Sequence, residues 1–230
     1  MLPTVQERKA LTRLVCHLVE PESRRAVGKA AALVEGDLVE LGLTLLEAIP
    51  PSPSSHVEGG QAGLAVLAWL CRREDATPPL KLALEAASRA QFPTSRRDIA
   101  KVALRVASDS TPMGLASLGL QMIDECGPYP GDGSAAGDSA LAALQGRPLT
   151  PAGLDVVRDA RRRMAEAADH ADKQDIAEAA LHRLLDLEVQ GKSVADLAAG
   201  LTPGPVGTAV RVTDRTLVVG GVSVRLKRRP

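Results

Sequence analysis

The sequence predicts a mainly α-helical protein, either a helical bundle or a short α-solenoid-like array, that ends in a small three-stranded antiparallel β-meander. Apolar residues make up 45% of the 230 residues, which is the share found in folded globular chains. Phe, Trp and Tyr occur once each, and this scarcity speaks against an all-β sandwich or barrel because strands are rich in aromatic side chains. Ala, Leu and Val supply the apolar volume instead, and Ala and Leu are strong helix formers.

Residues 1–126 are predicted to form a helical array. Apolar residues recur there at helical spacing, and Pro21, Gly36 and the Gly127-Pro128 pair interrupt the pattern. Asp37 is placed to cap a helix. The predicted helices span residues 4–19, 22–35, 38–49, 57–74, 79–91, 96–108 and 112–126.

Parts of this array resemble one another. Residues 80–89 align with residues 100–109 at an offset of 20, and a Gly-Leu-x-x-Leu pattern recurs at Gly42, Gly63 and Gly114. Helices that arrive about every 20 residues form pairs of about 40 residues, which is similar to the size of HEAT- or armadillo-type units. The Gly and Ala residues on these helices would allow close helix packing without aromatic side chains. A non-repetitive helical bundle remains the alternative.

Residues 127–138 are predicted to be a flexible loop that separates this array from a second part, residues 139–230. The prediction rests on composition, because the segment is dominated by Gly, Pro, Ser and Asp, which favour turns and loops. The second part is predicted to begin with helices at residues 139–145, 151–170, 172–190 and 193–201.

Residues 209–227 are predicted to form the β-meander. β-branched runs at 210–213, 216–219 and 222–226 are separated by short polar or glycine pairs, and Gly220-Gly221 is a strong two-residue hairpin turn. Three short strands are only marginally stable alone. We therefore expect the meander to pack on the helices or on a second subunit.

No motif in the sequence predicts catalysis, a metal site or a cofactor. Gly191-Lys192-Ser193 resembles the end of a phosphate-binding loop, but the required earlier glycine and the preceding strand are missing. Glu178, His182 and Asp186 lie on one helix face, but a spacing of eight residues covers about 12 Å along a helix, too far for one ion. We expect a solvated face there.

Arginine clusters carry the main functional signal. The formal net charge is zero, with 21 of the 28 basic residues being Arg, so any attraction to nucleic acid must come from a local patch. The residues that would contact backbone phosphates are Arg161, Arg162, Arg163, Arg211, Lys227, Arg228 and Arg229. Helices at 173–190 and 193–200 followed by the hairpin at 216–226 would also permit a winged-helix-like arrangement.

The sequence therefore favours a non-enzymatic scaffold or assembly protein that binds a partner protein, or a second copy of itself as a homodimer, through helical surfaces. Free strand edges in the meander favour pairing across a subunit boundary. The alternative is a nucleic-acid-associated protein that grips phosphates through the arginine clusters.

The sequence also predicts a cytoplasmic location and no membrane partner. The first residues turn polar at once, unlike a signal peptide, and the apolar run at residues 62–71 is too short to span a bilayer. The three cysteines are odd in number and far apart, so we expect reduced and mostly buried thiols rather than a disulfide framework.

Overall fold

The structure is a computed structural model that describes residues 3–50, 55–199, 211–213, 216–219 and 222–225, with side chains described for 3–50 and 56–188. Clustering of contacts divides the chain into two compact units, Met1–Leu187 and Glu188–Pro230. The described part is mainly helical, which confirms the predicted fold class at that level. Within that part, no helix is both long and apolar enough to cross a membrane.

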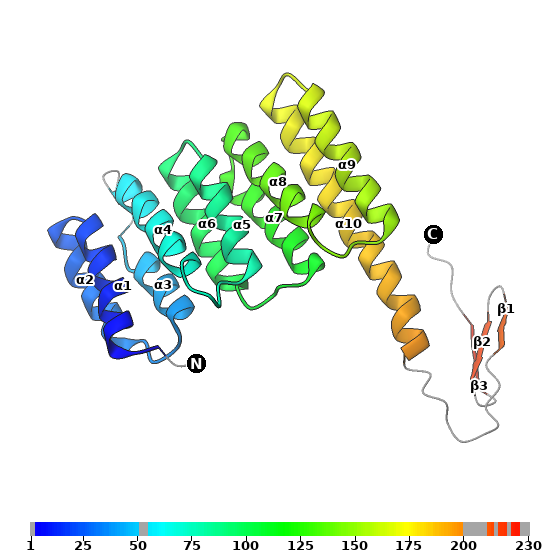
Figure 1. Ribbon diagram of the computed structural model, residues 1–230, viewed down its shortest axis with the longest axis horizontal. Coiled ribbons are helices and arrows are strands. Elements are labelled where there is room, and N and C mark those ends of the chain that lie inside the picture. The colour runs from blue at the N-terminus through cyan, green and yellow to red at the C-terminus, as the bar shows by residue number, and fades with distance from the viewer. Residues whose placement is uncertain (1–2, 51–54, 200–210, 214–215, 220–221, 226–230) are drawn as a thin grey trace. The chain divides into compact units, whose positions relative to one another are not determined.

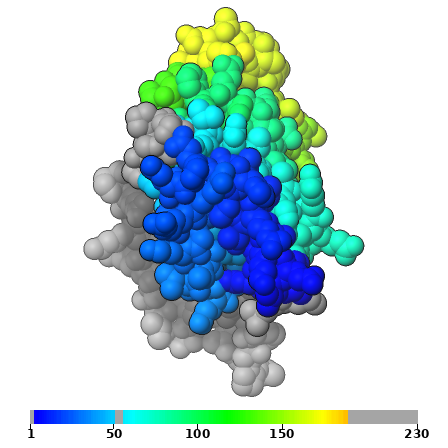
Figure 2. Space-filling view, turned by 90° about the vertical axis from the view of Figure 1, so that its left-hand side faces the viewer, coloured from blue at the N-terminus to red at the C-terminus, as the bar shows by residue number. Residues whose placement is uncertain are grey.

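Helices of the first unit follow one another side by side (Figure 1), and the last of them, α10, belongs to this unit as far as Leu187. Their bounds are α1 Val5–Leu18, α2 Pro21–Leu33, α3 Leu38–Glu47, α4 Ser55–Cys71, α5 Pro78–Arg89, α6 Pro93–Val106, α7 Pro112–Cys126, α8 Pro130–Gln145, α9 Pro151–Glu166 and α10 His170–Ala199. Packing partners are near neighbours in the chain: α4 packs on α1 and α6, α8 on α5 and α7, and α9 on α8. Figure 2 looks onto the end of the unit that α1, α2 and α3 form.

Proline and capping side chains fix where the helices begin. Proline occupies the first turn of α2 and of α5 to α9, where its missing N–H costs no hydrogen bond. Asp37 accepts from the backbone N–H groups of Val39 and Glu40, each at 2.9 Å, as the sequence predicted. Thr111 and Thr150 cap α7 and α9 in the same way. These local signals explain why most predicted helix starts lie within a few residues of the observed ones.

Glycines on α4 bring it into backbone contact with α6. A Cβ atom added to Gly60 would lie 2.6 Å from the carbonyl oxygen of Pro93, and one added to Gly63 would lie 3.1 Å from the Cβ of Ala100. Both distances are shorter than a normal van der Waals contact between carbon or oxygen atoms. The N-terminal half of α6 therefore rests directly on α4, as the Gly-Leu-x-x-Leu pattern at Gly63 suggested.

Glycines also allow close contact between α7, α8 and α10. A Cβ added to Gly119 of α7 would lie 2.6 Å from the Cβ of Ala140 of α8. A Cβ added to Gly137 of α8 would lie 2.4 Å from the Cβ of Ala177 of α10. Because α8 is lined by such small residues, it fits between its neighbours and lies in the interior of the unit.

The predicted flexible loop at 127–138 is wrong, because α8 begins at Pro130 and includes most of it. Its polar residues have partners within the fold: the carboxylate of Asp132, 2% exposed, accepts from the backbone N–H groups of Gln91 at 2.7 Å and Phe92 at 3.0 Å. A buried side chain that satisfies two main-chain donors replaces the water that a loop would need. The composition of residues 127–138 favours a loop, and it carries no information about the backbone N–H groups of Gln91 and Phe92 that bind Asp132 in the fold.

The predicted break between helices 173–190 and 193–201 is also wrong. Helix α10 continues from His170 to Ala199 without interruption. One glycine inside a helix costs only about 1 kcal/mol relative to alanine, so Gly191 alone does not end it. The division between compact units follows Leu187, not residues 127–138, so the predicted boundary is displaced as well.

Three strands belong to the second unit: β1 Arg211–Thr213, β2 Thr216–Val219 and β3 Val222–Arg225. They pair antiparallel in the order β1-β2-β3, with Leu217 of β2 opposite Val212 of β1 and Val224 of β3. The residues that connect the strands, including Gly220-Gly221, lie outside the described residues. The complete meander therefore stays a prediction.

The close contact between α4 and α6 predicts opposite effects of two identical substitutions. Gly60→Ala places a methyl group against the Pro93 backbone, and we expect overpacking to lower the free energy of unfolding by about 1–3 kcal/mol. Gly28→Ala, at an exposed position of α2 with nothing within 4 Å of the added atom, should raise it by about 0.5–1 kcal/mol. Urea unfolding followed by circular dichroism measures both. A stabilising Gly60→Ala would contradict the close helix contact.

The buried carboxylate of Asp132 predicts a second stability difference. Asp132→Asn leaves one oxygen to accept the two backbone N–H groups of Gln91 and Phe92, and we expect a loss of about 1–3 kcal/mol in the free energy of unfolding. Asp175→Asn makes the same change at an exposed position of α10 and should stay within about 0.5 kcal/mol of the parent chain. Equal effects in urea titrations would show that Asp132 is not an anchor of the loop before α6.

Candidate functional site

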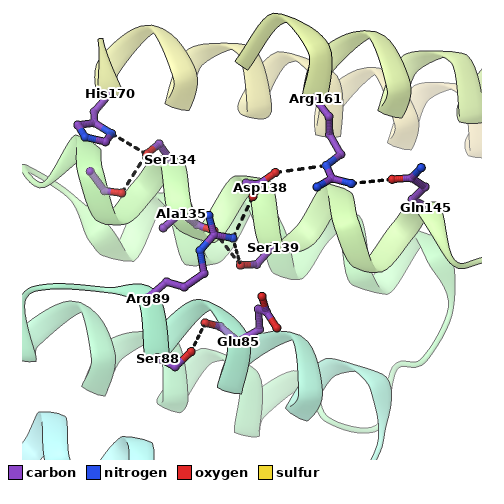
Figure 3. Close-up of polar contacts among 11 residues, drawn as sticks. Glu85, Ser88, Arg89, Ser134, Ala135, Asp138, Ser139, Gln145, Arg161 and His170 are labelled. Carbon is purple, nitrogen blue, oxygen red and sulfur yellow. Dashed lines mark hydrogen bonds and ion pairs between the residues drawn. The ribbon is translucent and has the colours of Figure 1, made fainter. Parts of the chain in front are cut away.

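A polar groove of about 460 Å³ lies beside α8, where the end of α5, the middle of α9 and the first turn of α10 meet. We call it the Asp138 groove. Figure 3 shows Arg89 approaching Asp138 from one side, with Arg161 and His170 placed on the other. The lining residues are Arg89, Gln91, Gly131, Ser134, Ala135, Asp138, Arg161, Met164, Ala165, His170 and Lys173.

Two arginines share the single carboxylate at the centre of the groove. Arg89 Nη1 lies 2.9 Å from Asp138 Oδ2, and Arg161 Nε lies 3.3 Å from Asp138 Oδ1. The side chains of both arginines are about two-fifths exposed, at 41% and 40%. Water therefore screens the two ion pairs, and each contributes little to stability on its own.

Further hydrogen bonds fix the orientation of both guanidinium groups. Arg89 Nη1 also donates to Ser139 Oγ at 3.2 Å, and Arg161 Nη1 donates to Gln145 Oε1 at 2.7 Å. A guanidinium has five N–H donors, so each arginine keeps donors that no other described residue accepts from. The two arginines are thus held in place with donors left over for a ligand.

Lys173 adds a third permanent positive charge to the groove. Its side chain forms no ion pair or hydrogen bond with the residues that the structure describes. With Arg89, Arg161 and Lys173 facing only one lining carboxylate, that of Asp138, the groove carries two positive charges in excess. This excess contrasts with the zero net charge of the whole chain.

Ser134 and His170 form a contact that resembles a nucleophile with its base but has a different hydrogen-bond pattern. Ser134 Oγ lies 3.2 Å from His170 Nδ1 and donates to the carbonyl oxygen of Gly131 at 2.9 Å. The direction of the His170 contact depends on the tautomer of the imidazole ring: while the hydroxyl donates to Gly131, the contact requires an Nδ1–H that donates to Ser134 Oγ. Ser134 is also only 6% exposed, so little of its surface reaches the groove.

The groove is therefore suited to holding an anionic group. Guanidinium groups bind carboxylates and phosphates through paired N–H donors, and an ammonium group adds a point charge. Ala135, Met164 and Ala165 give the groove apolar surface next to these cations. An extended segment that carries a negative group and a small apolar side chain would find partners for both.

Arg161, Arg162 and Arg163, which the sequence grouped as one patch, point in different directions. Arg161 lies in the Asp138 groove, whereas Arg162 pairs with Asp159 at 2.6 Å and Glu166 at 3.2 Å on the exposed side of α9. Arg163 lines a separate groove between α9 and α10. Successive residues of a helix are turned by about 100°, so a run of three cannot share one face.

The other predicted phosphate contacts stay predictions. Arg211 begins β1, but its side chain is not among those described. Lys227, Arg228 and Arg229 lie outside the described residues.

The predicted carboxylate–histidine column on α10 remains a solvent-facing arrangement. His182 Nε2 lies 3.9 Å from Glu178 Oε1, and the two side chains are 62% and 47% exposed. No group of three or more His, Cys, Asp or Glu side chains within the described ranges is placed to hold a metal ion.

Comparisons of the chain with protein-family models, curated proteins and solved structures found no match. The site is therefore assigned from its geometry.

Sequence reasoning missed Arg89, Ser134, Asp138, His170 and Lys173. Ser134 and Asp138 were placed in a loop, although their spacing of four residues after Pro130 would place them on one face of a helix. Arg89 lies 49 residues from the carboxylate it binds, and no pattern in the sequence connects the two.

The three thiols are free, and their burial predicts an order of reactivity. Burial, followed by the nearby charge of Asp132, raises the pKa of Cys126 to about 12, and burial also raises the pKa of Cys16 and Cys71. Because only the thiolate reacts, Cys126 should resist iodoacetamide at pH 8 until the chain unfolds in urea, whereas Cys16 and Cys71 react slowly in the folded chain. Peptide mass spectrometry measures each site. Fast labelling of folded Cys126 would contradict its burial.

Proposed function

We propose that the protein is a non-enzymatic scaffold whose helical surfaces bind other proteins and whose Asp138 groove holds an acidic segment of such a partner. The observation that carries this proposal is the arrangement of Arg89, Arg161 and Lys173 around one carboxylate, which leaves two positive charges without compensation. Acidic and phosphorylated segments are commonly recognised by clusters of arginines of this kind.

The packing order of the helices supports a scaffold. Each helix contacts near neighbours in the chain, which is typical of helical repeat arrays such as the α-solenoid that the sequence suggested. Arrays of this type offer long surfaces rather than enclosed pockets. The Asp138 groove is open, since its two arginines are about two-fifths exposed, and an extended peptide fits such a groove better than an enclosed small molecule does.

The polar contacts around Ser134 support a binding role over a catalytic one. While the Ser134 hydroxyl donates to the Gly131 carbonyl, its proton is directed away from His170. General-base activation requires that proton to be within reach of an unprotonated ring nitrogen. Ser134 instead fixes the ring of His170 at the edge of the groove.

The nucleic-acid alternative receives less support, because described arginines are paired with carboxylates in separate places. Arg97 lies 2.9 Å from Asp98, and Arg105 lies 2.8 Å from Glu47. Arg73 pairs with both Glu7 and Asp75. Acidic neighbours weaken the continuous positive field that backbone phosphates require. The alternative then depends mainly on Lys227, Arg228 and Arg229.

Substitutions in the groove predict opposite shifts in affinity for a fluorescein-labelled hexaglutamate peptide, measured by fluorescence anisotropy. Lys173→Gln removes an unpaired cation and should weaken binding about tenfold, the equivalent of about 1.4 kcal/mol. Asp138→Asn removes the carboxylate that competes for both arginines and should strengthen binding. Lys9→Gln makes the same charge change at an exposed position of α1 and should have little effect.

Salt and a second probe complete this experiment. Binding to the acidic peptide should weaken as salt rises, because the groove is partly exposed and screening acts over about 8 Å at physiological ionic strength. A labelled DNA duplex serves as the probe for the alternative. Tighter binding of the duplex than of the peptide, unchanged by Lys173→Gln, would favour the nucleic-acid function. Equal peptide binding by all four chains would overturn the assignment of the groove.

A further inference from the structure

A second groove, of about 410 Å³, lies between α9 and α10, the last helix pair of the first unit. We call it the α9–α10 groove. Apolar side chains on both helices form its floor, and charged side chains form its rim. The lining residues are Ala152, Asp155, Val156, Asp159, Ala160, Arg163, Ile176, Ala179, Ala180 and Arg183.

Helix α10 presents two different faces, and only one of them is used by the rest of the unit. Ala177 packs on Gly137 of α8, and Leu181 packs on Gly119 of α7; both α10 residues are fully buried. Ile176 and Arg183 lie on the other side and line the α9–α10 groove. The groove is therefore directed away from α7 and α8.

The apolar floor of this groove is unusual for the end of a helical array. Helices within an array bury their apolar faces on the next pair, so the terminal pair needs a polar outer face to remain soluble. Val156 and Ile176 are only partly buried by the unit and lie on the floor of the groove. This face has the composition of an internal contact, which indicates that another helical surface covers it.

Two charged side chains on the rim of the α9–α10 groove indicate that the covering surface is a second copy of the same groove. Asp155 and Arg163 line the same groove from α9, and neither side chain has a partner among the described residues. They lie symmetrically before and after Asp159, about 12 Å apart along the helix. If two α9 helices lie antiparallel about a two-fold axis at Asp159, Asp155 faces the partner subunit's Arg163, and Arg163 faces the partner subunit's Asp155.

The residue at the centre of such a contact is already neutralised. Asp159 pairs with Arg162 of its own helix at 2.6 Å, so two copies of Asp159 near the axis do not place two free charges together. Arg183, also unpaired among the residues described, adds a cation from α10 to the same rim.

We propose that the α9–α10 groove is a docking surface for a second copy of this chain, which binds in a two-fold arrangement with the α9 helices antiparallel. Such an interface is self-complementary, because the same patch contributes both the acidic and the basic partner. The proposal uses a different groove from the anion site and does not depend on the proposed function.

The opposite end of the first unit, formed by α1, α2 and α3, exposes both charged and apolar side chains. The exposed residues of α2 there include Arg25, Lys29 and Leu33, and Leu33 is 82% exposed. The two-fold arrangement therefore rests on the pairing of Asp155 with Arg163, and not on a contrast between the two ends of the unit.

Charge reversal and its rescue test the proposal. Sedimentation velocity of the full chain at micromolar concentration should show a dimer. Arg163→Asp and Asp155→Arg each place like charges opposite one another and should weaken dimerisation at least tenfold, the equivalent of about 1.4 kcal/mol. The double variant D155R/R163D recreates both pairs with reversed sign and should restore the dimer. Arg158→Asp, exposed on α9 but outside the groove, is the matched control and should remain dimeric.

Each other outcome contradicts the two-fold contact. If the unsubstituted chain is a monomer at the highest soluble concentration, the proposal is overturned. It is also overturned if Arg163→Asp and Asp155→Arg dimerise as well as Arg158→Asp does, because the dimer would then use another surface, such as the strand edges. Failure of D155R/R163D to recover, with unchanged circular dichroism, would exclude the antiparallel register. Lys173→Gln should dimerise normally, so loss of acidic-peptide binding and loss of the dimer remain separate results.

Discussion

Close contact between helix backbones at small side chains is the constraint on which the rest of this structure depends. With one Phe, one Trp and one Tyr in the chain, the interior is filled by bringing helices together rather than by inserting large rings between them. Gly60 against Pro93 and Gly137 against Ala177 leave no room for a single added methyl group. Such contacts determine which helices can be neighbours, because dispersion attraction depends steeply on distance. They also draw α8 into the interior, where its polar side chains meet α5, α9 and α10.

The sequence predicted the helices well where local chemistry determines their limits. Residues 79–91 and 112–126 were predicted helical, and the observed helices are Pro78–Arg89 and Pro112–Cys126. It failed at α8, because Gly, Ser and Asp favour loops only when nothing in the fold satisfies their polar groups. The backbone donors that Asp132 accepts from lie about 40 residues away. Tertiary contacts of that range are absent from any local pattern.

The candidate site was less predictable than the fold, for a geometric reason. The most visible charge run in the middle of a helix is formed by Arg161, Arg162 and Arg163. Because successive residues of a helix point in different directions, Arg161 lies in the Asp138 groove, Arg162 faces solvent and Arg163 lines the α9–α10 groove. The groove itself is assembled from residues as far apart as Arg89 and Lys173. Charge runs thus predicted where cations occur but not where they converge, because convergence is set by helix packing.

Helices α9 and α10 each contribute to both grooves. Arg161 binds Asp138 while Arg163, half a turn later, lines the opposite side, and α10 places Lys173 in one groove and Ile176 in the other. A small shift of this pair against α8 would change the Arg161–Asp138 distance and the α9–α10 surface together. If a ligand of the Asp138 groove favours one position of the helix pair, it changes the affinity of self-association by some factor. Thermodynamic linkage requires that self-association then changes the affinity for that ligand by the same factor. The close packing at Gly137 and Ala177 opposes such shifts, so any coupling would proceed by movement of the helix pair as a unit rather than by gradual deformation.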